Sequence, residues 1–185
     1  MKLLTAVNLM LPKLGEHPVT SLEINHPTLA IILPEVENEL ALTLNKGWWF
    51  NEYEYTAFPD NDGKIVLGAD TLMFTPMPTE PLALLRGLDL FDPVNQTYVW
   101  TKPIKGIVRS NVEFDLLPES AAQYIWYSAL VNIYVTDIGF TQEVQVWGAK
   151  AKNSLTDMLA EHCRQRRFST RHSRRFRKLQ ASLRA

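Results

Sequence analysis

Residues 116–139, LLPESAAQYIWYSALVNIYVTDIG, contain the strongest helical pattern in the chain. Apolar and small side chains recur there every three or four residues, which is the period of an amphipathic helix. Pro118 and Glu119 suit a first turn, and Gly139 suits the end of the helix. The predicted buried face consists of Ala121, Ile125, Ser128, Val131 and Val135.

The next segment, TQEVQVWGAKAKNSLTDMLAEHCRQ at residues 141–165, repeats this period after a very short connection. Helices joined so closely pack side by side in opposite directions, so we expect the second helix to be the antiparallel partner of the first. Its predicted inward stripe is Val144, Trp147, Ala151, Leu155, Met158 and Leu159.

Two further helices are predicted near the start of the chain. Gly15 can end the first in a left-handed cap, and Pro12 should disturb its last turn. Pro34 should kink or restart the second, at residues 28–46. The spacing of apolar residues carries both predictions: Leu3, Leu4, Val7, Leu11 and Leu14 in the first, and Leu29, Ile32, Val36, Leu40 and Leu44 in the second.

Between the helices, the pattern is typical of strands. Residues 51–58 alternate tyrosine with polar residues, 59–63 (PDNDG) supply a turn, and 64–74 are predicted to return as a hairpin. Residues 97–114 are rich in aromatic and β-branched side chains around Pro103 and Gly106, which predicts a further strand pair or a bulged edge.

The predicted fold class is therefore α+β: an antiparallel helical bundle of two N-terminal and two C-terminal helices, with a small antiparallel sheet inserted. We expect one domain at residues 1–163, with the bundle at 1–46 and 117–163 and the β insertion at 47–116. A basic C-terminal extension should form a separate arm at residues 164–185.

Charge separates the arm from the rest of the 185-residue chain. Residues 1–163 contain 10 Lys and Arg and all 20 Asp and Glu, so they sum to −10, whereas residues 164–185 carry nine cations and no acid. No apolar run is long enough to span a membrane, and the first residues do not form a signal peptide. The single cysteine, Cys163, cannot form an intramolecular disulfide.

The sequence offers no motif for catalysis or for a cofactor. It contains no glycine-rich phosphate loop, and Cys163 beside His162 falls short of a zinc site. Asp60 and Asp62 are spaced as in a calcium loop, but the first and last ligands are missing, which favours a plain turn. The cluster of Trp48, Trp49 and Phe50 is either core or a ligand platform, and core is the commoner outcome. We expect no enzyme, no cofactor and no metal.

The arm has two functional interpretations beside the simpler one of a solvated, disordered end. One is contact with nucleic acid phosphates, and the other is docking on an acidic protein surface. The apolar residues among these arginines favour docking on a protein surface, because contacts with phosphates need no apolar anchors. The candidate binding residues are Arg164, Arg166, Arg167, Phe168, Arg171, Arg174, Arg175, Phe176, Arg177 and Lys178.

Several segments together resemble the tail tubular protein A family, the head-to-tail adaptors of short-tailed bacteriophages. They are AVNLMLPKLGEHPVTSLE, NKGWWFN, DLFDPVNQTYVWTKPIKGIVRSNVEFDLLPESAAQYI and the helix ending in DIGF, in an order that covers most of residues 3–160. Pro12 and Pro34 interrupt segments that usually read as uninterrupted helix in the family. The basic extension lies outside the shared pattern.

The resemblance implies a structural virion protein made in the host cytoplasm. It implies a dodecameric ring, the portal protein and the tail nozzle protein, tail tubular protein B, as partners, and genomic DNA passing through the channel without sequence-specific binding. We then expect the ten residues of the arm named above to bind the portal. The alternative is a nucleic-acid-binding protein that uses its basic tail, and nothing in the sequence motivates a third possibility, an enzyme on the same fold.

Overall fold

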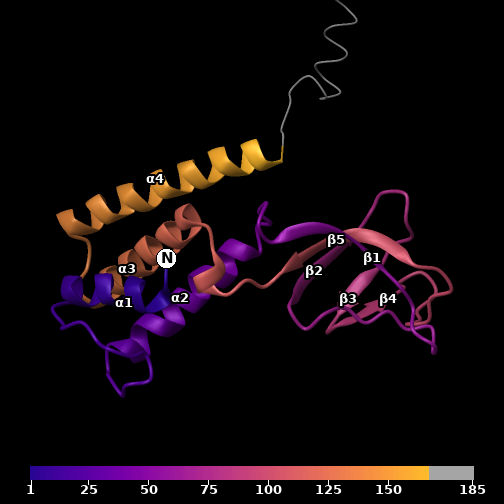
Figure 1. The fold of residues 1–185 in the computed structure, drawn as a ribbon, viewed down its shortest axis with the longest axis horizontal. Helices are drawn as coiled ribbons and strands as arrows, with labels where there is room; N and C mark the ends of the chain where they lie inside the picture. Colours follow the sequence, from indigo (N-terminus) through magenta and orange to yellow (C-terminus); the bar gives the residue numbers. More distant parts are fainter. Residues whose placement is uncertain (167–185) are drawn as a thin grey trace, which may run out of the picture.

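The computed structural model describes residues 1–166 and is of the mixed α+β class (Figure 1). The helical elements are α1 (Leu3–Met10), η1 (Leu11–Leu14), α2 (Leu29–Leu44), η2 (Phe114–Leu116), α3 (Glu119–Asp137) and α4 (Gln142–Gln165). The strands are β1 (Glu52–Ala57), β2 (Thr71–Pro76), β3 (Leu84–Arg86), β4 (Asp89–Phe91) and β5 (Ile104–Ser110). No helix in this part of the chain is long and apolar enough to cross a membrane.

The described chain forms an elongated molecule with helices at one end and strands at the other (Figure 1). Each end has its own hydrophobic core. We call these the helical unit, formed by residues 1–50 and 111–166, and the β unit, formed by residues 51–110. Every described helix belongs to the helical unit, and all five strands belong to the β unit.

α3 lies at the centre of the helical unit, where it contacts α1, α2 and α4. It is therefore buried over more than one stripe, and its buried face includes Ala121, Ala122, Ile125, Trp126, Ala129, Leu130 and Ile133. The predicted face is correct at Ala121 and Ile125 and wrong at Val135, which is 40% exposed. The prediction assumed that α3 packs against one other helix, whereas α3 is buried by contacts with three.

α4 covers α3 with a single stripe, which includes Val144, Ala151 and Met158 as predicted. Leu159 was predicted to face inward and is 47% exposed. Ser154 takes part in the buried stripe because positions 151, 154 and 158 repeat the helical spacing.

The predictions made at Pro12 and at Pro34 have different outcomes. Pro12 lies in the first turn of η1, and Gly15 ends η1 in the left-handed conformation at φ 83°, as predicted. α2 continues through Pro34, so a restart there does not occur. Ile32 and Val36 on either side of the proline are buried in the core, which holds the helix together across the lost hydrogen bond.

The sheet order β1-β5-β2 shows that the predicted hairpin of β1 with the next strand is wrong. β5 lies between them and pairs antiparallel with both. The returning segment instead pairs elsewhere, since Leu67 donates its N–H to the Leu88 carbonyl and Leu90 donates to the Ile65 carbonyl. β5 is thus the central strand of its sheet, whereas a bulged edge strand was one of the two predictions for this segment.

β3 and β4 form a small hairpin that the sequence analysis missed. Its turn contains Gly87, at φ 64°. The segment LLRGLDLF, residues 84–91, carries a signal for this turn, because glycine adopts a positive φ without steric cost in two-residue hairpin loops.

Candidate functional site

Two of the ten predicted arm residues, Arg164 and Arg166, lie within the described chain, at the end of α4. Arg164 is exposed and donates a long hydrogen bond within its own helix, to the Ala160 carbonyl at 3.3 Å. The remaining eight lie outside the described residues: Arg167, Phe168, Arg171, Arg174, Arg175, Phe176, Arg177 and Lys178.

Arg166 is bound to the β unit. Its guanidinium donates to Glu52 Oε1 at the start of β1, while Arg109 Nε on β5 donates to Glu52 Oε2 at 2.8 Å. The Glu52 side chain is only 8% exposed. Two guanidinium groups from distant parts of the chain therefore share one nearly buried carboxylate, which joins the base of the arm to the sheet.

Arg109 extends this connection to α2. Its Nη1 donates to the Asn45 carbonyl at 2.8 Å, just beyond the C-terminal end of α2, and contacts the Met73 sulfur at 3.4 Å. A cation is favourable at the carbonyl end of a helix. We call Glu52, Arg109 and Arg166, with the residues that hold them, the junction.

Glu52 is ionised in this setting. Burial opposes the charge and raises the pKa of Glu52, but the hydrogen bonds from Arg109 and Arg166 and their positive charges outweigh burial, so the pKa is held below its ordinary value. The ion pairs therefore persist to acidic pH.

We expect Glu52→Gln to lower the free energy of unfolding by about 1–3 kcal/mol at pH 7, because hydrogen bonds to charged groups contribute about this much. Since the folded pKa is depressed, the contribution is fully present above the unfolded pKa and is lost as the pH falls through the folded pKa. Urea titrations of the wild type and the variant should therefore converge below the ordinary pKa of 4.5. Glu54→Gln, an exposed position on the same strand, serves as the control, and a pH-independent difference for Glu52→Gln contradicts the assignment.

Trp48 and Asn51 complete the junction from the loop that links α2 to β1. Trp48 Nε1 donates to the Thr43 carbonyl at 2.8 Å, and its buried ring meets the ring of His162 on α4 edge-on, with centroids 5.5 Å apart. Asn51 is fully buried. Trp48 is thus a core residue, and Trp49 and Phe50 are half-buried and pack against the same core, which confirms the expected outcome for this cluster. Burial and the charge of Arg166 lower the pKa of His162, while Glu52 acts in the opposite direction.

Asn51 holds three backbone segments together. Its Oδ1 accepts the Trp48 N–H at 2.8 Å, and its Nδ2 donates to the carbonyls of Leu44 at 3.0 Å and Ser110 at 3.1 Å. The Ser110 N–H in turn donates to the Asn51 carbonyl at 2.9 Å. Asn51 therefore fixes the end of α2 against the first and last strands of the β unit.

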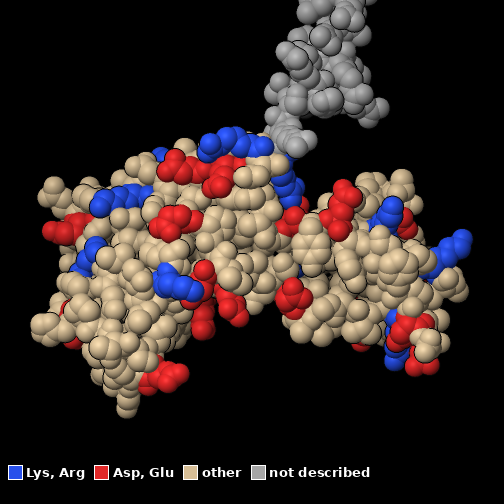
Figure 2. Space-filling model, viewed as in Figure 1, with Lys and Arg blue, Asp and Glu red and all other residues tan. Residues whose placement is uncertain are grey.

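The junction is an arrangement for positioning, built from hydrogen bonds and ion pairs, and the one polar atom beside it that lacks a partner among the described residues is the buried Nδ1 of His162. Within residues 1–166, no group of three or more His, Cys, Asp or Glu side chains could hold a metal ion. Asp60, weighed above as a calcium ligand, instead accepts the N–H groups of Asp62 and Lys64 at 2.9 and 2.8 Å and closes a turn. Figure 2 shows acidic side chains on both units beside the narrow connection between them.

Comparison with known proteins gives two matches. The profile of a family described as "Tail tubular protein" matches residues 4–168. The chain is also similar to "Tail tubular protein A" of Klebsiella phage KP34, with 27% identity over 174 residues that cover 94% of each chain. Both matches include the helical unit, the β unit and the junction.

Proposed function

The chain belongs to the tail tubular protein family and is a structural protein of a bacteriophage tail, and from this premise we propose that it is the head-to-tail adaptor of a short-tailed phage. Copies form a ring, expected to be dodecameric, that joins the portal of the capsid to the nozzle protein of the tail. The ring forms part of the channel through which DNA is ejected. The role is structural and not enzymatic.

The observation that carries this proposal is the extent of the family match, because residues 4–168 include all but the first three of the described residues. The elongated shape with separate cores at its two ends suits a subunit that reaches from one partner to another (Figure 1). The net charge of −10 on residues 1–163 would repel DNA phosphates in the channel.

Within this proposal, residues 1–163 are the adaptor domain and residues 164–185 are the arm, which binds an acidic surface of the portal. The arm residues named above supply the positive charge, with Phe168 and Phe176 as anchors. Because Arg166 is bound to Glu52, every arm leaves its subunit from the same place. Many equivalent arms around a ring would strengthen attachment through avidity.

Removing the arm should weaken attachment to the portal. We expect a chain that ends at Arg166 to bind portal rings at least about tenfold more weakly than the full chain, since it loses seven cations but keeps α4 and the contact of Arg166 with Glu52. Light scattering of the mixtures measures the mass of the complex. A full chain with Phe168→Ser and Phe176→Ser keeps the charge and tests the anchors separately, while unchanged affinity of the shortened chain contradicts portal binding by the arm.

The same charge supports a second candidate function, binding of nucleic acid by the arm. It predicts affinity for DNA of arbitrary sequence that falls steeply with salt, with log K decreasing by about 0.9 per neutralised phosphate for each unit of log salt. The chain ending at Arg166 should then lose DNA binding. Absence of DNA binding by the full chain at low salt excludes this function.

A further inference from the structure

An apolar groove runs along one side of α2, where the helical unit meets the β unit. It encloses a cavity of about 630 Å³ between α1, α2 and residues 111–115. Leu4, Leu33, Leu40 and Val112 contribute to its apolar wall, together with Leu72 from the β unit. The groove is large enough to receive several side chains of another protein surface.

Three exposed carboxylates make this groove acidic, those of Glu37, Glu113 and Asp115. Asp115 is bound to Lys2 Nζ at 3.2 Å and accepts the Leu3 N–H at 2.7 Å. Among the described residues, Glu37 and Glu113 have no cationic group within 4.0 Å. We call this surface the acidic groove; it has apolar walls and two carboxylates that lack a counter-charge within the described chain.

A surface of the opposite character lies on α3, between the end of α2 and α4. Tyr124, Tyr127, Val131 and Val135 follow one another at helical spacing and are all partly or fully exposed. Lys46 lies 5.8 Å from the centre of the Tyr124 ring, and Lys150 of α4 lies 5.7 Å from that of Tyr127. We call these six residues the lysine–tyrosine face.

The two lysines of this face form no salt bridge within the described residues, and the carboxylate whose charge acts on Lys46 is that of Glu39 on α2. No carboxylate within residues 1–166 lies within 4.0 Å of the Lys46 or Lys150 ammonium groups. Tyrosine is enriched at protein interfaces, and the two ammonium groups are held over the exposed tyrosine rings by cation–π attraction. The lysine–tyrosine face thus offers positive charges that complement the carboxylates of the acidic groove, and aromatic area that can cover the groove's apolar wall.

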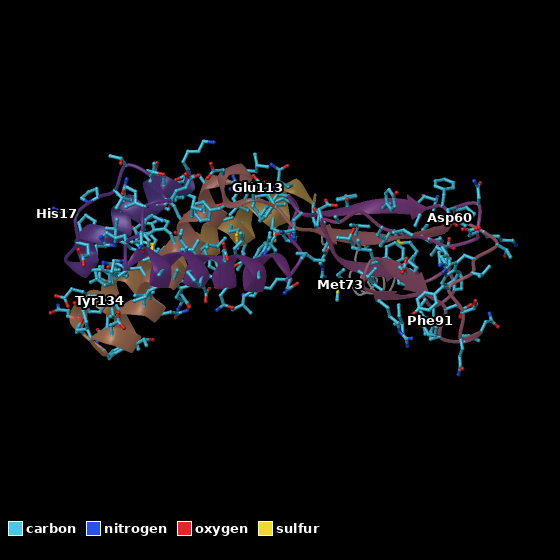
Figure 3. All side chains as sticks on the ribbon, turned by 90° about the horizontal axis from the view of Figure 1, so that it is seen from below. His17, Asp60, Met73, Phe91, Glu113 and Tyr134 are labelled. Atoms are coloured by element: carbon cyan, nitrogen blue, oxygen red, sulfur yellow. The ribbon has the colours of Figure 1, made fainter. Side chains whose placement is uncertain are left out.

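The two surfaces lie on opposite sides of α2. Glu35 and Glu39 face α3, since both accept hydrogen bonds from Asn132, at 2.8 and 2.9 Å. Glu37 is two residues further from Glu35, which is about 200° around the helix. Figure 3 likewise places Glu113, at the groove, and Tyr134, beside the lysine–tyrosine face, at opposite edges of the helical unit.

Surfaces on opposite sides cannot meet within one copy, but they can meet head to tail between copies, and a contact of this kind closes into a ring when its rotation allows. We propose that the lysine–tyrosine face of one copy docks in the acidic groove of the next. The inference rests on the proposed function, because it names the surfaces by which the adaptor ring closes. Lys46 and Lys150 then neutralise carboxylates such as Glu37 and Glu113 at the rim while the tyrosine rings cover the apolar wall.

Charge reversal tests the pairing directly. One full-length variant carries Glu37→Lys with Glu113→Lys, and a second carries Lys46→Glu with Lys150→Glu. Each alone places like charges across every interface, so we expect the assembled fraction to fall at least about tenfold. Mixed in equal amounts, the two variants should assemble again, because in an alternating ring every groove meets a face of opposite charge.

Assembly is measured as particle mass by light scattering, for the protein alone and on portal rings. A full chain with Asp62→Lys and Asp157→Lys, two exposed acids away from both surfaces, is the matched control and should assemble like the wild type. Circular dichroism and thermal unfolding establish that each variant is folded. Recovery in the mixture cannot come from a variant that fails to fold.

The outcomes separate the inference from the proposed function. If the wild type and both variants assemble equally, or if the mixture does not recover, the pairing is wrong although the adaptor function stands. If the chain ending at Arg166 loses ring formation in the absence of portal, the arm of a neighbour and not the lysine–tyrosine face occupies the groove. A wild type that assembles neither alone nor on portal rings overturns the proposed function, and the pairing with it.

Discussion

Replacing Asn51 with alanine is expected to lower the free energy of unfolding by about 3–5 kcal/mol, the largest effect at any polar position of the junction. The substitution removes three side-chain hydrogen bonds in a fully buried site. It leaves the Trp48 N–H and the Ser110 carbonyl without this partner, and each unsatisfied buried group costs about 1–3 kcal/mol. The Leu44 carbonyl loses one hydrogen bond but still accepts the Gly47 N–H at 3.1 Å. Urea titration followed by tryptophan fluorescence measures the loss.

Two further substitutions sharpen the test of Asn51. Asn51→Asp keeps the acceptor for Trp48 but sets a carboxylate against two carbonyl oxygens, so it should be no better tolerated than alanine. Asn153→Ala, on the exposed side of α4, controls for the loss of an asparagine as such and should change stability by less than about 0.5 kcal/mol. A similarly small effect at Asn51 would show that the three hydrogen bonds do not hold the units together.

Gly47→Ala is expected to cost about 2–4 kcal/mol, for two reasons that add. The backbone at Gly47 has φ 76°, a conformation that side chains disfavour by about 1–2 kcal/mol. A Cβ there would also overlap Glu52 Oε2 and Arg109 Nε, and the ion pair would have to open. The midpoint of thermal unfolding of the variant should therefore fall by an amount that corresponds to the sum of the conformational cost and the cost of opening the ion pair.

Gly87→Ala provides the matched comparison, because Gly87 has φ 64° and nothing within 4 Å of an added Cβ. It should cost only the conformational part, about 1–2 kcal/mol. The difference between the two variants isolates the contact with Glu52 and Arg109. Equal destabilisation at the two glycines would mean that the ion pair adjusts to the added carbon without cost.

The helices could be predicted from the sequence because their signals are local. The period of apolar residues located all four α-helices of residues 1–166, and Gly15 marked the end of η1. The inward faces were less predictable, since the face that a helix buries depends on how many neighbours it has. The exposure of Val135 on α3 illustrates this, because a central helix leaves free whichever side its three neighbours do not cover.

Strand pairing could not be predicted in the same way. The sequence of β1 indicated a strand, and the turn after it was real, but the partner of β1 is β5, about fifty residues away. Alternation of side chains specifies which face of a strand is buried and not which strand lies beside it. The hairpin of β3 with β4, by contrast, was local and could have been found from Gly87.

The junction itself was beyond sequence analysis, apart from its aromatic residues and the charge of the arm. Glu52 and Arg109 are 57 positions apart, and Arg166 is 114 positions from Glu52, so no spacing rule connects them. A buried asparagine such as Asn51 carries no composition signal either. Only the arm could be recognised from the sequence, because the net charge changes abruptly where it begins.

The hydrogen bonds between Asn51 and Ser110 join two residues that are 59 positions apart, the two ends of the β unit, so the β unit is a closed loop mounted on the helical unit. The entropy of closing such a loop depends only weakly on its length, changing by about 0.6 kcal/mol for each doubling. The helical unit can therefore tolerate a β unit of quite different size, provided that its ends still meet at Asn51. Recombination that exchanges this segment between related genes would alter one end of the molecule and leave the core of the other end undisturbed.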